Sequence, residues 1–154
     1  MGKKMEHLRN LLGEVYDLQA INLVLGWDQQ VNMPPGGAKA RSHHLATVNR
    51  ISHQKFISDE MGAALQAAKG ELEAAGADPD SNEMRIVVRV QEVYDKLRKV
   101  PSDWVAEFAR LTSLAQRNWE DARQGSDFAM FQPHLEKVIE LRRQYAEFLS
   151  LIHI

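Results

Sequence analysis

The sequence contains no cysteine, no long hydrophobic run and no marked excess of charge of either sign. Without cysteine the chain has no disulfides, no thiolate metal ligands and no cysteine nucleophile, which fits a cytoplasmic protein. A net charge of −2 gives no reason to expect nucleic acid or an anionic membrane as a partner. No run approaches the ~20 apolar residues of a membrane span, and the N-terminus, MGKKMEHLRN, lacks the apolar core of a secretory signal. We therefore expect a cytoplasmic protein that binds neither nucleic acid nor membrane.

The chain also lacks sustained two-residue alternation and internal repeats, so nothing predicts β-strands or a repeat fold. Its 154 residues, of which 44% are hydrophobic and 26% charged, suit one globular domain. Apolar residues recur at three- and four-residue steps, which predicts an all-α fold of about six long antiparallel helices joined by short loops. The first two helices are expected at 3–31 and 38–56, and the fourth at 81–100. The third is expected to be capped by Ser58 or Asp59 and ended by Gly76. The fifth is expected to be capped by Ser102 or Asp103 and to end near 124, and the last to be opened by Phe131 or Gln132.

Three apolar stripes predict which helix faces are buried. The first helix carries Leu8, Leu11, Leu12, Val15, Leu18, Ile21 and Leu25, a face that Trp27 extends. The fifth helix is expected to bury Trp104, Phe108, Leu111, Ala115 and Trp119, and the last helix Leu135, Val138, Leu141, Tyr145 and Phe148.

The segment 26–41, GWDQQVNMPPGGAKAR, is the joint between the first two helices. Pro34 stops the first helix because the residue before a proline is pushed out of the helical region, while Gly36 and Gly37 permit backbone angles closed to other residues. The two glycines before a helix start are also a weaker candidate for an anion site, but the spacing of a phosphate loop is missing. Asp28 either braces this joint or contacts a ligand, and the first interpretation is favoured. The basic residues Lys39, Arg41 and Arg50 are expected on a solvated or ion-paired face.

No histidine stands three or four residues from another histidine or an acidic residue, so spacing predicts no helical metal site. His43 and His44 are neighbours and diverge by about 100° on a helix. We interpret them as a surface or interface pair, and His53 and His134 as lone structural histidines. A ligand set assembled from distant helices stays open.

Two blocks of residues resemble one known family. The first contains Trp27-Asp28-Gln29, Met33-Pro34-Pro35-Gly36, Ala40-Arg41 and Leu45-Ala46; the second contains Trp119, Ala122-Arg123, Asp127-Phe128 and Phe131-x-Pro133-x-Leu135. In this order they resemble the N-terminal region of the carboxypeptidase Taq family of zinc-dependent metallocarboxypeptidases, over about residues 5–149.

The resemblance implies a helical hydrolase that removes C-terminal amino acids from peptides. It also implies zinc or another divalent metal held by a His-Glu-x-x-His helix and a later Glu, and a homodimer. That metal helix does not occur in this chain, so the resemblance assigns no catalytic or metal residue here and predicts an inactive fragment that lacks its C-terminal catalytic part. The family signature comprises residues that are structural or line the substrate groove: Trp27, Asp28, Gln29, Met33, Pro34, Pro35, Gly36 and Arg41.

Residues 1–148 are thus expected to form the N-terminal helical region of a metallocarboxypeptidase, and 149–154, LSLIHI, a truncated or non-native tail. Some apolar stripes should then face solvent in the chain alone, with that of the last helix the first candidate. Two alternatives stay open. One is a free-standing helical interaction or scaffold module without catalysis, and the other is a helical metal-binding protein.

Overall fold

The computed structural model describes residues 2–151, and regular structure in that range is entirely helical. The elements are α1 (Lys3–Val31), a 3-10 helix η1 (Pro35–Gly37), α2 (Ala38–Phe56), α3 (Asp59–Ala74), α4 (Asn82–Leu97), α5 (Ser102–Gln124) and α6 (Phe128–Phe148). The predicted all-α fold with six long helices is confirmed, and the bounds of the first two helices agree with the expected ones. None of the helices between residues 2 and 151 has the length and apolar character needed to cross a membrane.

Local caps explain several helix ends. The Ser58 hydroxyl accepts a hydrogen bond from the Met61 amide at 3.1 Å and starts α3, as the sequence predicts. Gly76 follows the end of α3 with a φ of 64°, a left-handed conformation that glycine adopts without steric cost. The Ala77 amide then reaches back to the Leu72 carbonyl at 3.0 Å, which satisfies a carbonyl of the last helical turn.

Three predicted helix ends are wrong. α4 ends at Leu97, three residues early, because the chain turns there before Pro101. Neither Ser102 nor Asp103 caps α5: its N-cap is Pro101, which offers no side-chain hydrogen bond. The Ser102 hydroxyl is instead 2.9 Å from the Nδ1 atom of His53.

The last helix starts at Phe128 and not at Phe131 or Gln132. A start at the later residues would have kept Pro133 in the first turn, where the missing N–H costs nothing. The structure places Pro133 inside the helix, and a carboxylate oxygen of Asp127 accepts a hydrogen bond from the Met130 amide at 3.2 Å. The Asp127 cap therefore sets the start of α6, although the proline leaves one helical acceptor without its donor.

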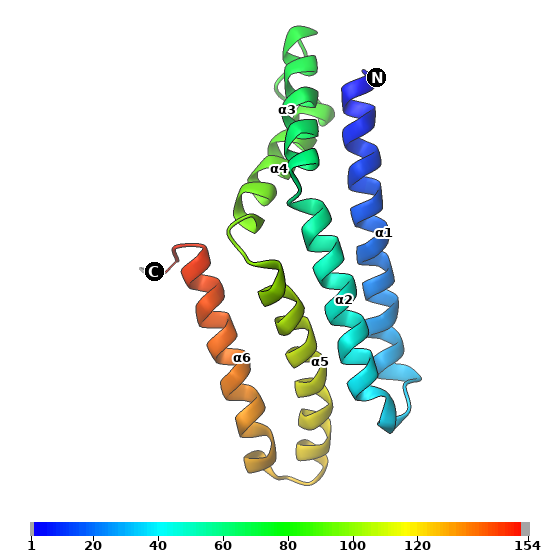
Figure 1. Ribbon diagram of the computed structural model, residues 1–154, viewed down its shortest axis with the longest axis vertical. Coiled ribbons are helices and arrows are strands. Elements are labelled where there is room, and N and C mark those ends of the chain that lie inside the picture. The colour runs from blue at the N-terminus through cyan, green and yellow to red at the C-terminus, as the bar shows by residue number, and fades with distance from the viewer. Residues whose placement is uncertain (1, 152–154) are drawn as a thin grey trace.

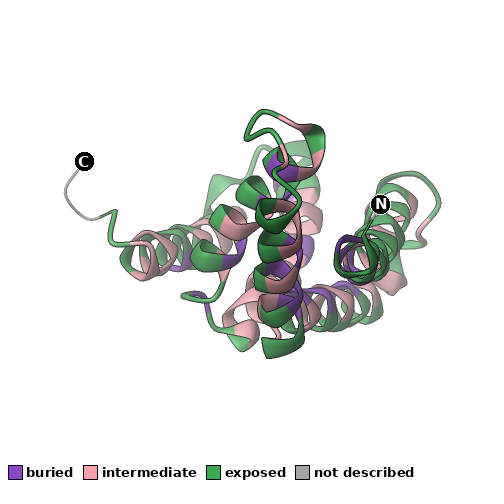
Figure 2. Cartoon of the chain, turned by 90° about the horizontal axis from the view of Figure 1, so that it is seen from above, coloured by how far each residue is buried: buried purple, intermediate pink, exposed green. Residues whose placement is uncertain are grey.

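The helices pack as a layer at one end of the molecule and as a small bundle at the other (Figure 1). In the lower part of Figure 1, α6, α5, α2 and α1 lie side by side in this order. In the upper part, α3 and α4 pack against the N-terminal half of α1. Figure 2 shows the buried positions along the sides where neighbouring helices face one another.

The main core belongs to the upper bundle. Met5, Leu8, Met61 and Leu65 are each at most 1% exposed, and burial of one such side chain stabilises a protein by about 1.5–3 kcal/mol. Tyr94 closes this core, with its ring 6.3 Å from that of Phe56. The remaining members of the cluster are Leu11, Val15, Phe56, Ala64, Ala68 and Val87.

The layer buries less of its apolar surface than the sequence predicts. Ile21 is 50% exposed and Trp27 60%, so the apolar face of α1 that was expected to continue to Trp27 is fully buried only in its first half. Ile51 in α2 and Trp119 in α5 are also exposed. Helical spacing identifies residues that share a face, but it does not show whether another helix covers that face.

Aromatic packing joins α5 to α6. The Trp104 ring stacks on Phe108 and on Tyr145 with centroid separations of 5.1 and 5.3 Å, and Phe148 meets it edge-on at 6.0 Å. Arg142 lies 4.5 Å above the Phe108 ring. The half-buried stripe of α6 therefore has a partner, and the prediction that this stripe is the first to face solvent is wrong.

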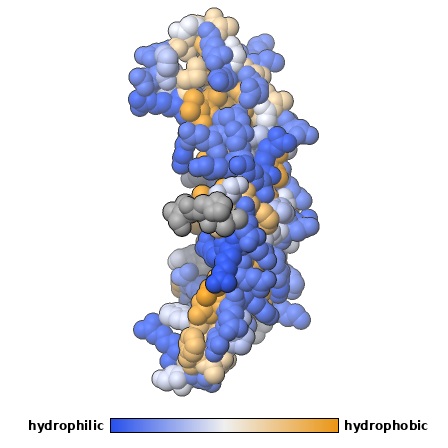
Figure 3. Space-filling view, turned by 90° about the vertical axis from the view of Figure 1, so that its left-hand side faces the viewer, coloured by the Kyte–Doolittle hydropathy of each residue, from blue (hydrophilic) through white to orange (hydrophobic). Residues whose placement is uncertain are grey.

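Exposed apolar side chains near α6 gather at its start. Figure 3, which views the α6 side, shows a hydrophobic strip in the lower part of the molecule, where Figure 1 places the turn between α5 and α6. Phe128 and Met130 near that turn are 63% and 44% exposed. The tail from 149 that the sequence predicts to be truncated or non-native is described only as far as Leu151; residues 152–154 lie outside the described residues.

Candidate functional site: a braced joint beside an uncharged groove

The joint between α1 and α2 is held by a side chain from the first turn of α2. Arg41 donates through Nη2 to Oδ2 of Asp28 and through Nη1 to the backbone carbonyl of Leu25, each at 2.5 Å. The Arg41 side chain is 14% exposed and that of Asp28 34%, so the ion pair is partly shielded from water. The hydrogen bond from Arg41 is the main cause that holds the pKa of Asp28 below its ordinary value of 3.8. The expected ion pairing of Arg41 and bracing by Asp28 are thus both present.

Backbone bonds complete the same joint. The Asp28 carbonyl accepts from the amides of Asn32 at 3.0 Å and of Met33 at 2.9 Å, which ends α1. The Pro34 carbonyl accepts from the Gly37 amide at 2.8 Å and forms η1. These bonds satisfy the polar backbone of a tight reversal that contains two prolines without amide hydrogens.

Gly37 is needed for space and not for an unusual backbone angle. Its φ of −80° is open to any residue, so the predicted need for permissive angles does not apply at this position. A Cβ atom at Gly37 would instead lie 2.9 Å from Cγ of Met33. The order Met33 to Gly37 therefore encodes close packing within the joint.

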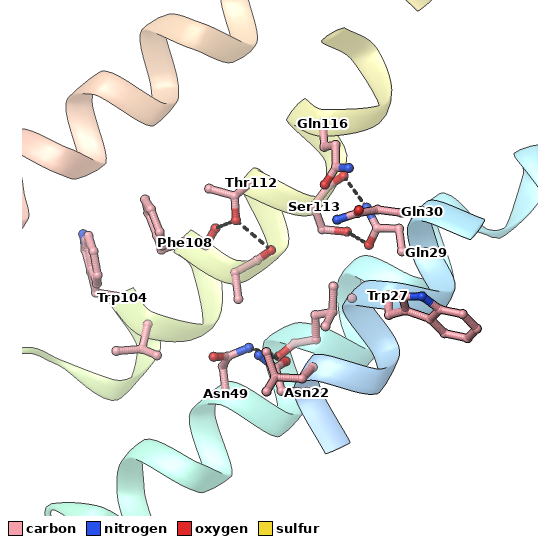
Figure 4. A pocket seen from close by; sticks show the side chains of 15 residues that line it. Asn22, Trp27, Gln29, Gln30, Asn49, Trp104, Phe108, Thr112, Ser113 and Gln116 are labelled. Atoms are coloured by element: carbon pink, nitrogen blue, oxygen red, sulfur yellow. Dashed lines mark hydrogen bonds between the residues drawn. The ribbon is translucent and has the colours of Figure 1, made fainter. Parts of the chain in front are cut away.

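A groove runs beside the joint, with walls from α1 and α5 and a floor from α2 (Figure 4). Its volume is about 560 Å³. The floor contributes Leu45 and Asn49, and α5 contributes a row that extends from Trp104 to Gln116. No charged residue belongs to the described lining, although 26% of the chain is charged.

Two pairs of polar side chains tie the three helices together at the groove. Gln29 in α1 and Ser113 in α5 bond twice: Ser113 Oγ donates to Gln29 Oε1 at 2.8 Å, and Gln29 Nε2 donates to the Ser113 carbonyl at 3.1 Å (Figure 4). Asn49 in α2 donates to Asn22 Oδ1 in α1 at 2.9 Å. Because these amides and hydroxyls are neutral, the groove holds polar groups without an electrostatic preference for an anion or a cation.

The residues of the sequence signature separate into two places. Trp27 and Gln29 line the groove, and Figure 4 shows the Trp27 ring at the rim, turned away from α5. The others form the joint outside the groove lining: Asp28, Met33, Pro34, Pro35, Gly36 and Arg41. Sequence reasoning missed Asn22, Asn49 and Ser113. The only local signal was that Asn22 and Asn49 stand inside helices, where asparagine is an unfavourable residue.

The described residues do not fit a metal ion. Between residues 2 and 151 the structure brings together no group of three or more His, Asp or Glu side chains that suits one. His43 and His44 are exposed on α2. His53 is buried, and both of its ring nitrogens are engaged, one by Ser102 Oγ and the other by the Leu97 carbonyl at 3.2 Å.

Comparison with known proteins places the chain in a family. The family model for the carboxypeptidase Taq (M32) metallopeptidases matches residues 7–152. The chain is 34% identical to thermostable carboxypeptidase 1 of Pyrococcus furiosus and 28% identical to that of Thermus thermophilus, over 94% of this chain in both cases. It spans only 29% and 28% of the length of these two relatives.

Structural similarity agrees with the sequence match. The crystal structure of BsuCP superposes with a TM-score of 0.87 over 96% of this chain and 29% of that one, and at 21% identity this likeness concerns the fold. The match in sequence along almost the whole chain, together with this shared arrangement of helices, shows that the chain belongs to the carboxypeptidase Taq (M32) metallopeptidase family and corresponds to its N-terminal part.

Proposed function

We propose that the chain is the N-terminal helical part of a zinc-dependent carboxypeptidase that removes C-terminal amino acids from peptides. The observation that carries this proposal is the family match over residues 7–152, with relatives named as carboxypeptidases and about 29% of their length covered. The metal and the groups that activate water belong to the rest of that protein, because the described residues here do not fit a metal site. This chain alone is proposed to be inactive.

The role proposed for the described residues is positional. Asp28 and Arg41 fix the angle between α1 and α2, and Gln29 with Ser113 fixes α5 against α1. A rigid arrangement of these helices supplies a wall against which the catalytic part is held. A structural role for the signature residues, the homodimer of the parent enzyme and a cytoplasmic location belong to the same proposal.

The test is to extend the reading frame and assay the products. We expect an in-frame His-Glu-x-x-His downstream and, in the extended protein, release of the C-terminal residue from an N-blocked dipeptide that is lost with a chelator and restored by zinc. The 154-residue chain should release none. A natural stop codon after Ile154 would contradict the proposal and favour a free-standing helical interaction module, for which the exposed apolar side chains of α1 would be the contact surface. If another divalent ion restored the activity and zinc did not, that ion would replace zinc as the proposed metal.

A further inference from the structure

We propose that the groove between α1 and α5 receives a helix from the remaining part of the enzyme, which completes a four-helix bundle with α1, α2 and α5. The proposal rests on the proposed function, because it takes its occupant from the part of the carboxypeptidase beyond this chain. The relatives supply that part, since about 29% of their length corresponds to the residues described here.

The arrangement of the three helices defines the vacant position. α2 packs between α1 and α5, and the Gln29–Ser113 bonds draw the two outer helices together across it. Two helices on either side of a third leave a trough on its surface, and bundles fill such a trough with a fourth helix. The α5 wall runs from Trp104 to Gln116, which at 1.5 Å per residue is about 18 Å, or roughly three helical turns.

The chemistry of the groove suits a helix and not the charged end of a peptide. A carboxypeptidase substrate ends in a carboxylate, and recognition of a carboxylate favours a cationic partner. The described lining has no charged residue. It offers apolar positions such as Leu45 and Val105 beside neutral amides and hydroxyls, and this mixture matches the partly polar inner face of a packed helix.

Exposure at the α1 wall supports a partner of this kind. Leu23 is 73% exposed and Trp27 is 60% exposed, although both line the groove. Gly26 stands between them, and a Cβ atom built there meets nothing within 4 Å. Glycine inside a helix costs roughly 1 kcal/mol relative to alanine, and none of the described neighbours requires one at this position. At the groove, the missing side chain of Gly26 leaves room for a helix to cross close to the α1 backbone.

The experiment compares Gly26→Leu with Gly70→Leu. Gly70 is a matched control because it also lies inside a helix, in α3, with nothing within 4 Å of its Cβ position and away from the groove lining. In the 154-residue chain both substitutions are expected to keep or raise the midpoint of thermal unfolding, because both add helix propensity in open space. In the extended protein, Gly26→Leu is expected to lower that midpoint, while Gly70→Leu does not.

Each other outcome overturns the proposal. Equal midpoints for the two variants of the extended protein, with an unchanged KM, mean that no helix fills the groove. An unchanged midpoint with a raised KM for a peptide means that the groove binds substrate. A 154-residue chain that is a dimer, and that becomes a monomer on Gly26→Leu, means that a second copy fills it. Failure of the proposed function can be distinguished from failure of this proposal. It would appear as a missing downstream reading frame or as an extended protein without carboxypeptidase activity.

Discussion

The guanidinium of Arg41 lies 2.5 Å from the carboxylate of Asp28, across a reversal built from two prolines and two glycines. The reversal itself joins two helices but does not set the angle between them. Arg41 helps to fix that angle because the same side chain also donates to the Leu25 carbonyl, one turn earlier in α1. The family signature in this segment therefore encodes a fixed helix pair.

Replacement of Arg41 should loosen this pair. Arg41→Ala removes the donors to Asp28 and to the Leu25 carbonyl, and Arg41→Lys should recover only part of the loss because an ammonium lacks the planar fork. Both variants should lower the denaturant midpoint and speed amide exchange at Asn32 and Met33. Arg85→Ala is the control, because its ion pair with Asp80 is exposed at both ends. Equal losses at the two sites would contradict a bracing role.

Acid should weaken the same joint. The folded-state pKa of Asp28 lies below its ordinary 3.8, chiefly because of the hydrogen bond from Arg41. The stability that this carboxylate contributes is therefore complete above pH 3.8 and is lost as the pH falls through the lower folded-state pKa. Denaturant midpoints at pH 7 and at low pH should converge for wild type and Asp28→Asn as acid is added. An equal difference at both pH values would exclude a role for the charge.

The sequence predicts the fold where its signals are local. Ser58 and Gly76 mark the two ends of α3 because a cap and a left-handed glycine act within one turn. At α6 two local signals conflict, since Asp127 favours an early start and Pro133 a late one. The Asp127 cap prevails, and α6 starts early. Tertiary packing decides that Trp27 stays exposed while Trp104 is covered by α6.

The candidate site is predictable only in part for the same reason. Asp28 and Arg41 lie 13 residues apart in one motif, so their pairing is accessible from sequence. Gln29 and Ser113 are separated by 84 residues, and no periodicity connects them. The groove depends on the Gln29–Ser113 contact and on how three helices are placed in space. Residue spacing along the chain predicts neither of these.

His53 should make stability depend on pH near neutrality. Burial lowers its pKa from the ordinary 6.5, although the hydrogen bond to the Leu97 carbonyl acts in the opposite direction. Stability is then full above pH 6.5 and falls as the pH drops through the lower folded-state pKa, because the unfolded chain binds the proton more readily. Free energies of unfolding between pH 8 and pH 5 should fall for wild type and fall less for His53→Gln. His44→Gln, at an exposed position, is the control. If the unfolding free energy of His53→Gln fell with pH as steeply as that of wild type, His53 would not be the source of the pH dependence.

Two leucines should differ sharply in their contribution to the chain alone. Leu65 is fully buried in the upper core, so Leu65→Ala should cost about 2–5 kcal/mol of unfolding free energy. Leu23 is 73% exposed at the groove, so Leu23→Ala should change the unfolding free energy by less than about 0.5 kcal/mol. Urea unfolding of the 154-residue chain measures both. A large loss for Leu23→Ala would show that the chain already covers this surface, for example by self-association.

The same substitution at two glycines of α3 should have opposite signs. A Cβ atom at Gly62 would lie 2.4 Å from the Tyr94 hydroxyl and 3.0 Å from its ring, and this tyrosine is held because it is buried and donates to the Ser58 carbonyl at 3.1 Å. Gly62→Ala should therefore lower the thermal midpoint. Gly70→Ala meets open space and should raise stability by up to about 1 kcal/mol through helix propensity. A gain at both positions would mean that α3 and α4 pack less closely than the Gly62–Tyr94 contact requires.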